Sequence, residues 1–457
     1  MSKNHCDELY ISYLFPPLNK ASGITVFKRI AENNKKVDVL QGKFDLSSDF
    51  NDYVDNYINE RFYVSVDDSL DWTSFIFKFI EKGLNEIKKD YENIYSRSWL
   101  MANHFLAFEY KCLNRNVFWT AEFSDPLIYD IHNKKRQFKQ MVIDDEKFIS
   151  KINKEITVFN KNNNSNFKLI ENNSMAYFIA EYLVYLFADR IIFTNENQCR
   201  FMLNQFPENI RQLVLNKSEI RRHPTLSEDF YKIKNVDLNL DNNKVNIAYF
   251  GNEFYSKRHF EALFYAVEAL NHKFKDKLKI YIYTSDHDLL KKLIPSDIFS
   301  VREPLDYLDF LNATTKFDIL IVNDAITKDN FEINPYLPSK LSDYLGSNTD
   351  IWALYEDGSS LSQFNLKYKS EINDYDSCLY ELVKIIEDRG FCDDDFSIDE
   401  NYINSRLTNL NDLYEQTFRQ KQRLESEIEK LTFENNEIKS SNSWKITKPL
   451  RNLKNKK

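Results

Sequence analysis

Glycine is scarce in this chain, which has only 7 glycines among 457 residues. Average usage would supply roughly four times as many. Each glycine is therefore informative, and Gly23, Gly251 and Gly346 all lie in loops or at helix ends beside predicted strands. The spacing GxGxxG does not occur, so the fingerprint of a nicotinamide-binding site is missing.

Cysteine pairs and long apolar runs are also missing. The five cysteines are scattered, odd in number and never spaced as CxxC, so neither a disulfide framework nor a thiolate zinc site is indicated. No apolar run is long enough to span a bilayer, and no secretory leader is visible. We therefore expect a protein of the reducing cytoplasm.

The composition is that of a folded protein with more than one domain. Hydrophobic residues make up 42% of the chain, with 36 phenylalanines and 27 tyrosines, which is ample for large cores. The formal net charge of −9 argues against a surface that coats nucleic acid, and we expect no nucleic-acid partner.

Strand-like runs alternate with helical patterns twice along the chain. In the first series, strands are predicted at 9–15, 37–40, 62–66, 94–96, 117–121 and 190–194, with helices at 23–30, 74–87 and 175–187. In the second, strands are predicted at 245–250, 278–283, 317–322 and 350–355. The polar stretch Leu226–Lys244 is the expected linker. The fold class is therefore α/β, with two tandem Rossmann-like domains at 1–227 and 228–405.

The remainder, 406–457, has a different sequence pattern and is predicted to be a coiled-coil helix with a basic tail. A heptad pattern runs through Leu410, Thr417, Leu424, Leu431 and Ile438, although Lys421 and Asn435 weaken it. Two interpretations stay open for 407–440: a charged helix on its own domain, or an intermolecular coiled coil with a second copy of the chain or with a partner. The last fifteen residues carry six Lys/Arg, which suit a solvated end, a peripheral contact with anionic lipid, or a contact with an acidic partner.

Doubly wound domains bind ligands outside the carboxyl ends of their strands, so the loops there hold the candidate residues. In the second domain, Gly251 ends a strand, and Lys257 and Arg258 open the next helix. Cations beside free helix N–H groups suit a diphosphate. A lysine–arginine pair is also common on ordinary surfaces, so this stretch alone decides nothing.

The stretch NPYLPSKLSDYLGSN, 334–348, is the strongest candidate. Pro338 suits the first turn of a helix, which places Ser339 and Lys340 where N–H groups favour phosphate oxygens. Asp343 follows on the same helix face and could accept the two hydroxyls of a ribose. The alternative is an ordinary capped helix with a local Lys–Asp pair.

Polar residues also follow predicted strands of the first domain. They are Gly23 at a helix start, His104 after a strand, and Glu122 and Asp125 in WTAEFSDPL. Each has a plain structural alternative, namely a loop, a core histidine or a turn. Together with the second domain they give the layout of a two-domain sugar transferase.

The motifs FPPLNKASGI, SRSW…NH, WTAEFSDPL, ADRIIFTNENQ, HPTL, YFGNEFYSKR and NPYLPSKLSDYLGS carry a resemblance over about residues 8–400. The chain resembles retaining glycosyltransferases of the GT-B fold, in the family 4 group, and especially bacterial enzymes that build surface polysaccharides or cell-wall glycans. The proline-Ser-Lys helix start is the most specific of these motifs.

The resemblance implies roles for the second domain. Lys257 and Arg258 would neutralise the donor diphosphate, Ser339 and Lys340 would bind its phosphate, and Asp343 would hold the ribose. Asp343 matches the second acid of the family's Glu-x7-Glu motif, whereas the first falls on Pro335, so that Glu332 is the nearby substitute. The family's arginine ahead of the lysine is missing, since Asn252 and Glu253 follow Gly251.

It also implies that His104 lies near the transferred sugar and that Glu122 and Asp125 orient the acceptor. The implied reaction is transfer from a nucleotide-diphosphate sugar to a glycan, lipid-linked or polymer acceptor, with retention at the anomeric carbon. No cofactor and no metal are expected, because Lys257 and the helix start would stabilise the charge of the leaving diphosphate. The alternatives are a sugar epimerase, phosphorylase or hydrolase of similar fold, or a degenerate transferase that acts as a scaffold through its coiled-coil tail.

Overall fold

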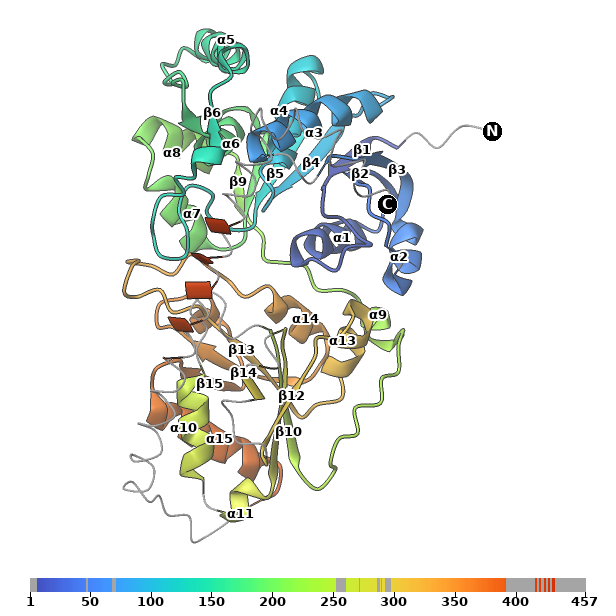
Figure 1. Cartoon of the computed structure of the whole chain (residues 1–457), viewed down its shortest axis with the longest axis vertical. Coiled ribbons are helices and arrows are strands. Elements are labelled where there is room, and N and C mark those ends of the chain that lie inside the picture. Colours follow the sequence, from blue (N-terminus) through green and yellow to red (C-terminus); the bar gives the residue numbers. More distant parts are fainter. Residues whose placement is uncertain are drawn as a thin grey trace, which may run out of the picture. The chain divides into compact units, whose positions relative to one another are not determined.

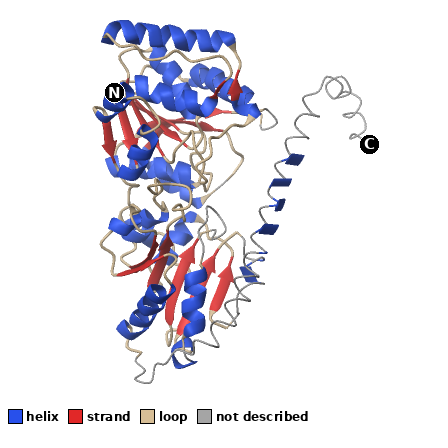
Figure 2. Cartoon of the chain, turned by 90° about the vertical axis from the view of Figure 1, so that its left-hand side faces the viewer, coloured by secondary structure: helices blue, strands red, loops and turns tan. Residues whose placement is uncertain are grey.

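A computed structural model describes most of the chain. The described residues are 6–46, 48–67, 71–251, 260–270, 272–285, 288, 290–291 and 297–391, with a few single residues between 416 and 431. The described residues of 6–66 and 72–391 belong to one compact unit (Figure 2). Nearly all of the predicted coiled coil and basic tail lies outside the described residues, so both stay predictions.

The first half of the large unit is built on a sheet of seven strands. They are β1 (Glu8–Ile11), β2 (Val37–Gly42), β3 (Ile58–Val64), β4 (Asn93–Ser98), β5 (Phe118–Phe123), β8 (Arg190–Phe193) and β9 (Ser218–Ile220). Their order is β3-β2-β1-β4-β5-β8-β9, and every pairing is parallel. The short strands β6 (Val142–Ile143) and β7 (Ser174–Met175) pair separately and antiparallel.

Helices cover both faces of this sheet (Figure 1). They are α1 (Ala21–Asn33), α2 (Asp49–Val54), α3 (Trp72–Glu86), α4 (Ala102–Leu113), α5 (Glu146–Asn163), α6 (Ala176–Phe187), α7 (Glu196–Leu203) and α8 (Glu208–Leu215), with short 3-10 turns at Asp55–Tyr57 and Lys139–Met141. Helix α4 packs between α3 and α6 on one face, and α1 lies on the other. Such coverage explains why β1 and β2 are almost completely buried.

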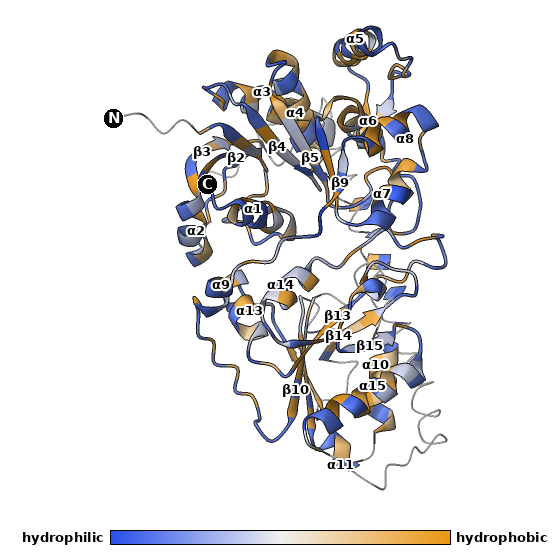
Figure 3. Cartoon of the chain, turned by 180° about the vertical axis from the view of Figure 1, so that it is seen from behind, coloured by the Kyte–Doolittle hydropathy of each residue, from blue (hydrophilic) through white to orange (hydrophobic). Residues whose placement is uncertain are grey.

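The second half repeats the design with six parallel strands. They are β10 (Val245–Phe250), β11 (Leu278–Tyr283), β12 (Phe299–Arg302), β13 (Ile319–Asn323), β14 (Asp350–Tyr355) and β15 (Tyr368–Glu371), in the order β12-β11-β10-β13-β14-β15. The helices are α9 (Glu228–Lys232), α10 (Glu261–Ala269), α11 (His272–Lys275), α13 (Tyr307–Thr314), α14 (Lys340–Gly346) and α15 (Tyr375–Asp388), with a 3-10 turn at Leu361–Gln363. The strand β10 is buried along its whole length and strongly hydrophobic (Figure 3).

Both sheets are wound outward from their first strand, which confirms the predicted α/β fold with two Rossmann-like sheets. The order reverses between β1 and β4 in one sheet and between β10 and β13 in the other. In open α/β sheets, ligands bind at such switch points, outside the carboxyl ends of the strands. The loops that begin α1 and follow β4, β10 and β13 are thus the places for a site.

The structure corrects two expectations about individual segments. The strand predicted at 9–15 ends at Ile11, and the chain then turns toward Pro16. The stretch Leu226–Lys244 is not a plain polar linker, because it contains α9 and buries Phe230 and Tyr231 in the core. Two ring contacts, of Phe230 with Phe27 and with Tyr57, hold this segment against the first half. Among the described residues, no helix combines the length and apolarity needed to cross a bilayer.

Candidate active site

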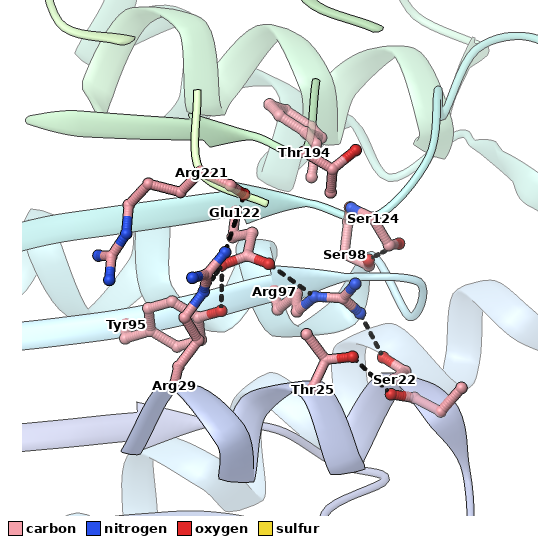
Figure 4. Close-up of polar contacts among 12 residues, drawn as sticks. Ser22, Thr25, Arg29, Tyr95, Arg97, Ser98, Glu122, Ser124, Thr194 and Arg221 are labelled. Atoms are coloured by element: carbon pink, nitrogen blue, oxygen red, sulfur yellow. Dashed lines mark hydrogen bonds and ion pairs between the residues drawn. The ribbon is translucent and has the colours of Figure 1, made fainter. Parts of the chain in front are cut away.

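The switch point of the first sheet holds a buried cluster of charged side chains, which we call the arginine–glutamate cluster: Arg29, Tyr95, Arg97 and Glu122 (Figure 4). Glu122 lies on β5 and is fully buried. Its Oε2 accepts hydrogen bonds from Arg29 Nε at 2.9 Å and from the Tyr95 hydroxyl at 2.9 Å, and its Oε1 accepts one from Arg97 Nε at 3.1 Å. The carboxylate is thus the counter-ion of two guanidinium groups.

Electrostatics keep Glu122 ionised. Burial alone would raise the pKa of this carboxyl, but the nearby Arg29 and Arg97 outweigh burial and lower the pKa to about 2. Both oxygens are occupied by neighbouring side chains. Any contribution of Glu122 to binding an acceptor would therefore pass through the arginines that it holds, and its predicted role stays a prediction.

The two arginines connect the cluster to the chain on either side. Arg29 Nη2 donates to the carbonyl oxygens of Arg221 and Arg222, at 2.9 and 2.8 Å, which ties α1 to the segment after β9. Arg97 Nη1 donates to Ser22 Oγ, at 3.3 Å, in the first turn of α1. Arg97 therefore bridges Glu122 and the start of a helix.

Gly23 lies in the first turn of α1, directly against the loop after β1. A Cβ atom at this position would lie 1.9 Å from the Leu14 carbonyl oxygen, so a larger residue would force the helix away. This close approach is a packing reason for glycine, and it accounts for the residue whether or not a ligand binds. The predicted contact of Gly23 with a donor stays a prediction.

His104 lies in the first turn of α4 and is only 1% exposed. Ser96 Oγ receives a hydrogen bond from the Trp119 indole N–H at 2.8 Å and lies 2.8 Å from His104 Nδ1. The Ser96 hydroxyl then has Nδ1 as its acceptor, which leaves the proton of the imidazole on Nε2. Burial, with the charge of Arg97, lowers the pKa of His104 to about 3, so the ring is neutral.

His104 Nε2 is buried and has no hydrogen-bond partner among the residues that the structure describes. A buried N–H without an acceptor is costly and marks a place where a ligand oxygen or a water would be favourable. The arrangement suits donation of a hydrogen bond to a sugar hydroxyl. It does not suit general acid catalysis, because the ring does not carry a second proton at neutral pH.

Asp125 lies just beyond β5 and is half-buried. The adjacent residue, Ser124, donates its backbone N–H to Ser98 Oγ at 3.2 Å, and its hydroxyl contacts the Ser98 carbonyl. These contacts fix the loop after β5 against the end of β4. Asp125 is therefore held at the carboxyl edge of the sheet, where it was predicted.

In the second half, the loop after β13 is organised by Glu356, which the sequence analysis did not single out. Glu356 is 2% exposed and accepts from the backbone N–H of Thr327 at 2.6 Å, the Thr327 hydroxyl at 2.5 Å, Lys328 N–H at 2.8 Å and Asn334 Nδ2 at 2.9 Å. The one sequence feature that could have indicated Glu356 is its position directly after the predicted strand 350–355. Glu332 lies in this same loop and is exposed to solvent.

The loop leads into the short helix α14 as the motif predicted. Pro338 is buried, and Ser339 is the N-cap residue, whose side chain makes no capping hydrogen bond. Lys340 is half-buried at the first helical position. Ser339 and Lys340 thus open a helix beside the switch point of the second sheet.

Asp343 has partners that the sequence did not reveal. Its Oδ1 lies 2.5 Å from Lys28 Nζ and accepts a hydrogen bond from the Tyr307 hydroxyl at 2.8 Å. Lys28 also donates to Ser342 Oγ at 3.0 Å. The expected alternative of a local pair with Lys340 is therefore wrong, because the counter-ion comes from α1. A lysine inside an amphipathic helix gives no sequence signal of burial.

Lys257 and Arg258 lie outside the described residues, so their predicted contact with a diphosphate stays a prediction. Gly251 ends β10 as expected, directly before that stretch. Within the described part of the chain, no three His, Cys, Asp or Glu side chains are grouped so that they could hold a metal ion.

The fold is shared with solved sugar-transfer proteins. No family model matches the sequence, and no curated protein matches it. HepE of Anabaena, solved with UDP-glucose, is 10% identical, with 91% of this chain and 96% of HepE covered, at a TM-score of 0.52. An Escherichia coli structure described as trehalose-6-phosphate bound with UDP-2-fluoro glucose is 11% identical over 93% of this chain and 98% of its own, at 0.51.

A third similar structure is an alpha,alpha-trehalose-phosphate synthase (UDP-forming) from Burkholderia xenovorans, solved with glucose-6-phosphate. It is 8% identical, with 92% of this chain and 99% of that chain covered, at a TM-score of 0.51. At such low identities the likeness establishes the fold, which is the GT-B arrangement of two Rossmann-like domains.

Proposed function

We propose that this protein is a glycosyltransferase that moves a sugar from a nucleotide-diphosphate sugar to an acceptor. The main observation behind the proposal is that a set of polar residues lies at each of the two switch points of the GT-B fold. One set contains Ser22, Arg97 and His104, and the other contains Ser339 and Lys340. Similar structures were solved with UDP-glucose and UDP-2-fluoro glucose, which supports a nucleotide-sugar donor.

In this proposal the second sheet binds the donor. Lys257, Arg258, Ser339 and Lys340 neutralise the diphosphate, whose charge increases as the glycosidic bond breaks. Asp343 holds the ribose, in exchange for part of its contact with Lys28. Glu332, Pro338 and Gly251 shape the loops around the nucleotide. No metal or cofactor is required, because the cations of the chain supply the positive charge.

The first sheet then presents the acceptor and the transferred sugar. Gly23 lets α1 approach the donor, His104 donates its Nε2 proton to a sugar hydroxyl, and Glu122 and Asp125 set the acceptor side. We propose retention at the anomeric carbon and a glycan, lipid-linked or cell-surface polysaccharide acceptor, as the sequence resemblance implies. We also propose that the protein lies in the cytoplasm, at the inner face of the membrane through its basic tail. We further propose that it self-associates through 407–440.

A thermal-shift screen of the full-length chain tests the donor side. Nucleotide sugars and nucleoside diphosphates are added at increasing concentration, and binding to the folded state raises Tm by mass action. We expect one nucleotide class to raise Tm in a saturable way. If none of the common nucleotide diphosphates or their sugars stabilises the protein, the transferase proposal is wrong.

The reaction itself is tested with the donor that the screen identifies. The product sugar is followed by NMR, since retention and inversion give different anomeric couplings. We expect the anomeric configuration of the donor to be kept. A chain lacking residues 406–457 separates catalysis from scaffolding, because a catalyst keeps its turnover in solution, whereas a scaffold loses its role.

A further inference from the structure

A groove with a volume of about 540 Å³ lies at the C-terminal end of α1. Three segments form it: the turn after α1, the end of α2 with the 3-10 turn that follows, and the start of α9. We call it the tyrosine groove, and its main lining residues are Asn34, Lys35, Tyr53, Asn56, Tyr57 and Asp229. Sites for small molecules usually have volumes of about 300–1,000 Å³, so this groove is large enough to hold one.

The tyrosine groove is separate from the candidate active site. Ser22 and Gly23 lie in the first turn of α1, whereas Asn34 follows the last residue of that helix. A helix rises by about 1.5 Å per residue, so the 13 residues of α1 separate its two ends by about 20 Å. No candidate site residue that the structure describes lines the groove. A ligand bound here would therefore not occupy the place of the reacting groups.

Two tyrosine rings form one side of the groove. Tyr53, Asn56 and Tyr57 are spaced i, i+3 and i+4 along the helical segment 49–57, so they share one face of it. Tyr53 is 37% exposed, and Tyr57 is half-buried. The Tyr57 ring packs against Phe27, with centroids 5.6 Å apart, and against Phe230, with centroids 6.3 Å apart. This side of the groove is thus an aromatic surface that the core holds in place and that solvent reaches.

Polar groups surround the two rings. The lining supplies the amides of Asn34 and Asn56, the ammonium group of Lys35 and the carboxylate of Asp229. Within the described part of the chain, neither tyrosine hydroxyl makes a hydrogen bond, and Lys35 and Asp229 have no ion-pair partner. Hydrogen-bond donors and acceptors of several kinds can therefore meet a ligand beside the rings.

The charges of the lining indicate which kind of ligand fits. Lys35 and Lys36 are offset by Asp229 in the lining and by Asp52, which precedes Tyr53 in sequence. No arginine is among the described lining residues. A phosphate or polyanion site would need an excess of cations. A neutral sugar instead needs an aromatic surface for the C–H face of its ring, and mixed donors and acceptors for its hydroxyls.

We propose that the tyrosine groove binds a neutral oligosaccharide and holds a glycan acceptor at a distance from its reacting end. The inference rests on the proposed glycosyltransferase function and deepens it, because it makes the acceptor a glycan of several sugars. A chain held at a second site has a raised effective concentration at the first, so the groove would favour long acceptors over short ones.

The test uses a panel of neutral oligosaccharides as probes: maltohexaose, cellohexaose, laminarihexaose and chitohexaose. Each is titrated into the full-length protein without nucleotide, and binding is followed by saturation-transfer NMR. We expect wild type to bind at least one of them in a saturable way. Tyr53→Ala should weaken that binding by about fivefold or more, as is common when a central aromatic contact is truncated. Tyr53→Phe keeps the ring and should keep most of the affinity.

Tyr380→Ala is the matched control. Tyr380 is 69% exposed on α15 and does not line the groove, so its loss should leave the affinity unchanged. Polyphosphate, added as a competitor, should not displace the oligosaccharide, because the lining has no strong excess of cations. Displacement by polyphosphate would show that the groove prefers an anion and would overturn the assignment to a neutral glycan.

The remaining outcomes separate this inference from the proposed function. If no oligosaccharide of the panel binds, or if Tyr53→Ala binds it as tightly as wild type and Tyr380→Ala, the groove is not a glycan site and the donor proposal is unaffected. Displacement by UDP would assign the sugar to the nucleotide site, which also overturns the inference. If binding depends on Tyr53 while no nucleotide raises Tm, the glycan site stands and the transferase function fails.

Discussion

Lys28 Nζ lies 2.5 Å from Asp343 Oδ1, and the two residues are 2% and 6% exposed. Lys28 belongs to α1 of the first half of the chain and Asp343 to α14 of the second. The Tyr307 hydroxyl completes the contact by donating to the same oxygen. The acid that the sequence assigned to a ribose is therefore held by a lysine from a helix of the first half, and one buried ion pair joins the two halves that carry the candidate site residues.

Replacing Lys28 should be costly because it leaves Asp343 buried without its counter-ion. We expect Lys28→Met to lower the free energy of unfolding by about 3–5 kcal/mol, as measured by chemical denaturation. The double variant Lys28→Met/Asp343→Asn should recover part of that loss, because no lone charge remains. Additive losses for the two single variants would show that the pair is not coupled.

Glu122 should make the protein sensitive to acid. Its pKa is about 2 in the folded protein against an ordinary value of 4.5, so its stabilising effect is fully present above about pH 4.5 and is lost as the pH falls toward 2. The shift corresponds to about 3 kcal/mol, at 1.36 kcal/mol per unit. Glu122→Gln should be destabilised at pH 7 and should approach wild type near pH 3. A constant gap between the two across this range, measured by denaturation, would rule out a titrating Glu122.

Much of the fold was predictable because buried strands in parallel sheets are continuous apolar runs. The runs at 245–250 and 278–283 match β10 and β11 residue for residue. The strands β12 and β15 were missed, since FSVR and YKSE lie at positions where burial is partial and the run is short. Their strand character comes from pairing with β11 and β14, which a local pattern does not contain.

The candidate site was predictable only in part, for a related reason. The helix start at Ser339 and Lys340 was visible because proline and capping residues act on their own neighbours in sequence. The partners of Glu122 and Asp343 were not visible, since Arg29 and Lys28 come from a distant helix and look like solvent-facing residues. Which lysines and arginines face inward depends on how distant elements pack together, and the spacing of residues in the sequence does not show it.

Lys340 should contribute to donor binding more than to stability. We expect Lys340→Ala to weaken the affinity for the nucleotide found in the screen by about tenfold or more, because a cation is removed from the diphosphate. Lys257→Ala should behave in the same way. Isothermal calorimetry checks both variants against Lys78→Ala, which removes an exposed lysine on α3. Unchanged affinity in Lys340→Ala and Lys257→Ala would refute the donor cradle.

His104 should affect turnover more than nucleotide affinity. His104→Phe fills the same buried space but removes the unpaired Nε2 donor, so we expect the fold and the nucleotide affinity to be kept while turnover falls by about tenfold or more. The comparison requires the rate and the nucleotide affinity for wild type and variant. If both fall equally, or if neither falls, His104 is a core residue and not a partner of the transferred sugar.

Glu181 on α6 should give the opposite pH dependence to Glu122. Burial raises its pKa to about 8, despite a hydrogen bond of 2.9 Å from the Tyr185 hydroxyl, so the carboxyl is protonated in the folded protein at neutral pH. The unfolded chain ionises near 4.5, and therefore the protein should lose stability as the pH rises from about 4.5 to 8.

Glu181→Gln removes that titration while keeping the shape of the protonated side chain. We expect it to match wild type near pH 4.5 and to be more stable at pH 8 by several kcal/mol, since each pKa unit corresponds to about 1.4 kcal/mol. Denaturant titrations at four pH values would measure the gap, with the exposed Glu86→Gln as control. A gap that does not widen with pH would mean that Glu181 is ionised in the fold, and a charge would then have to be stabilised in the core of the first half.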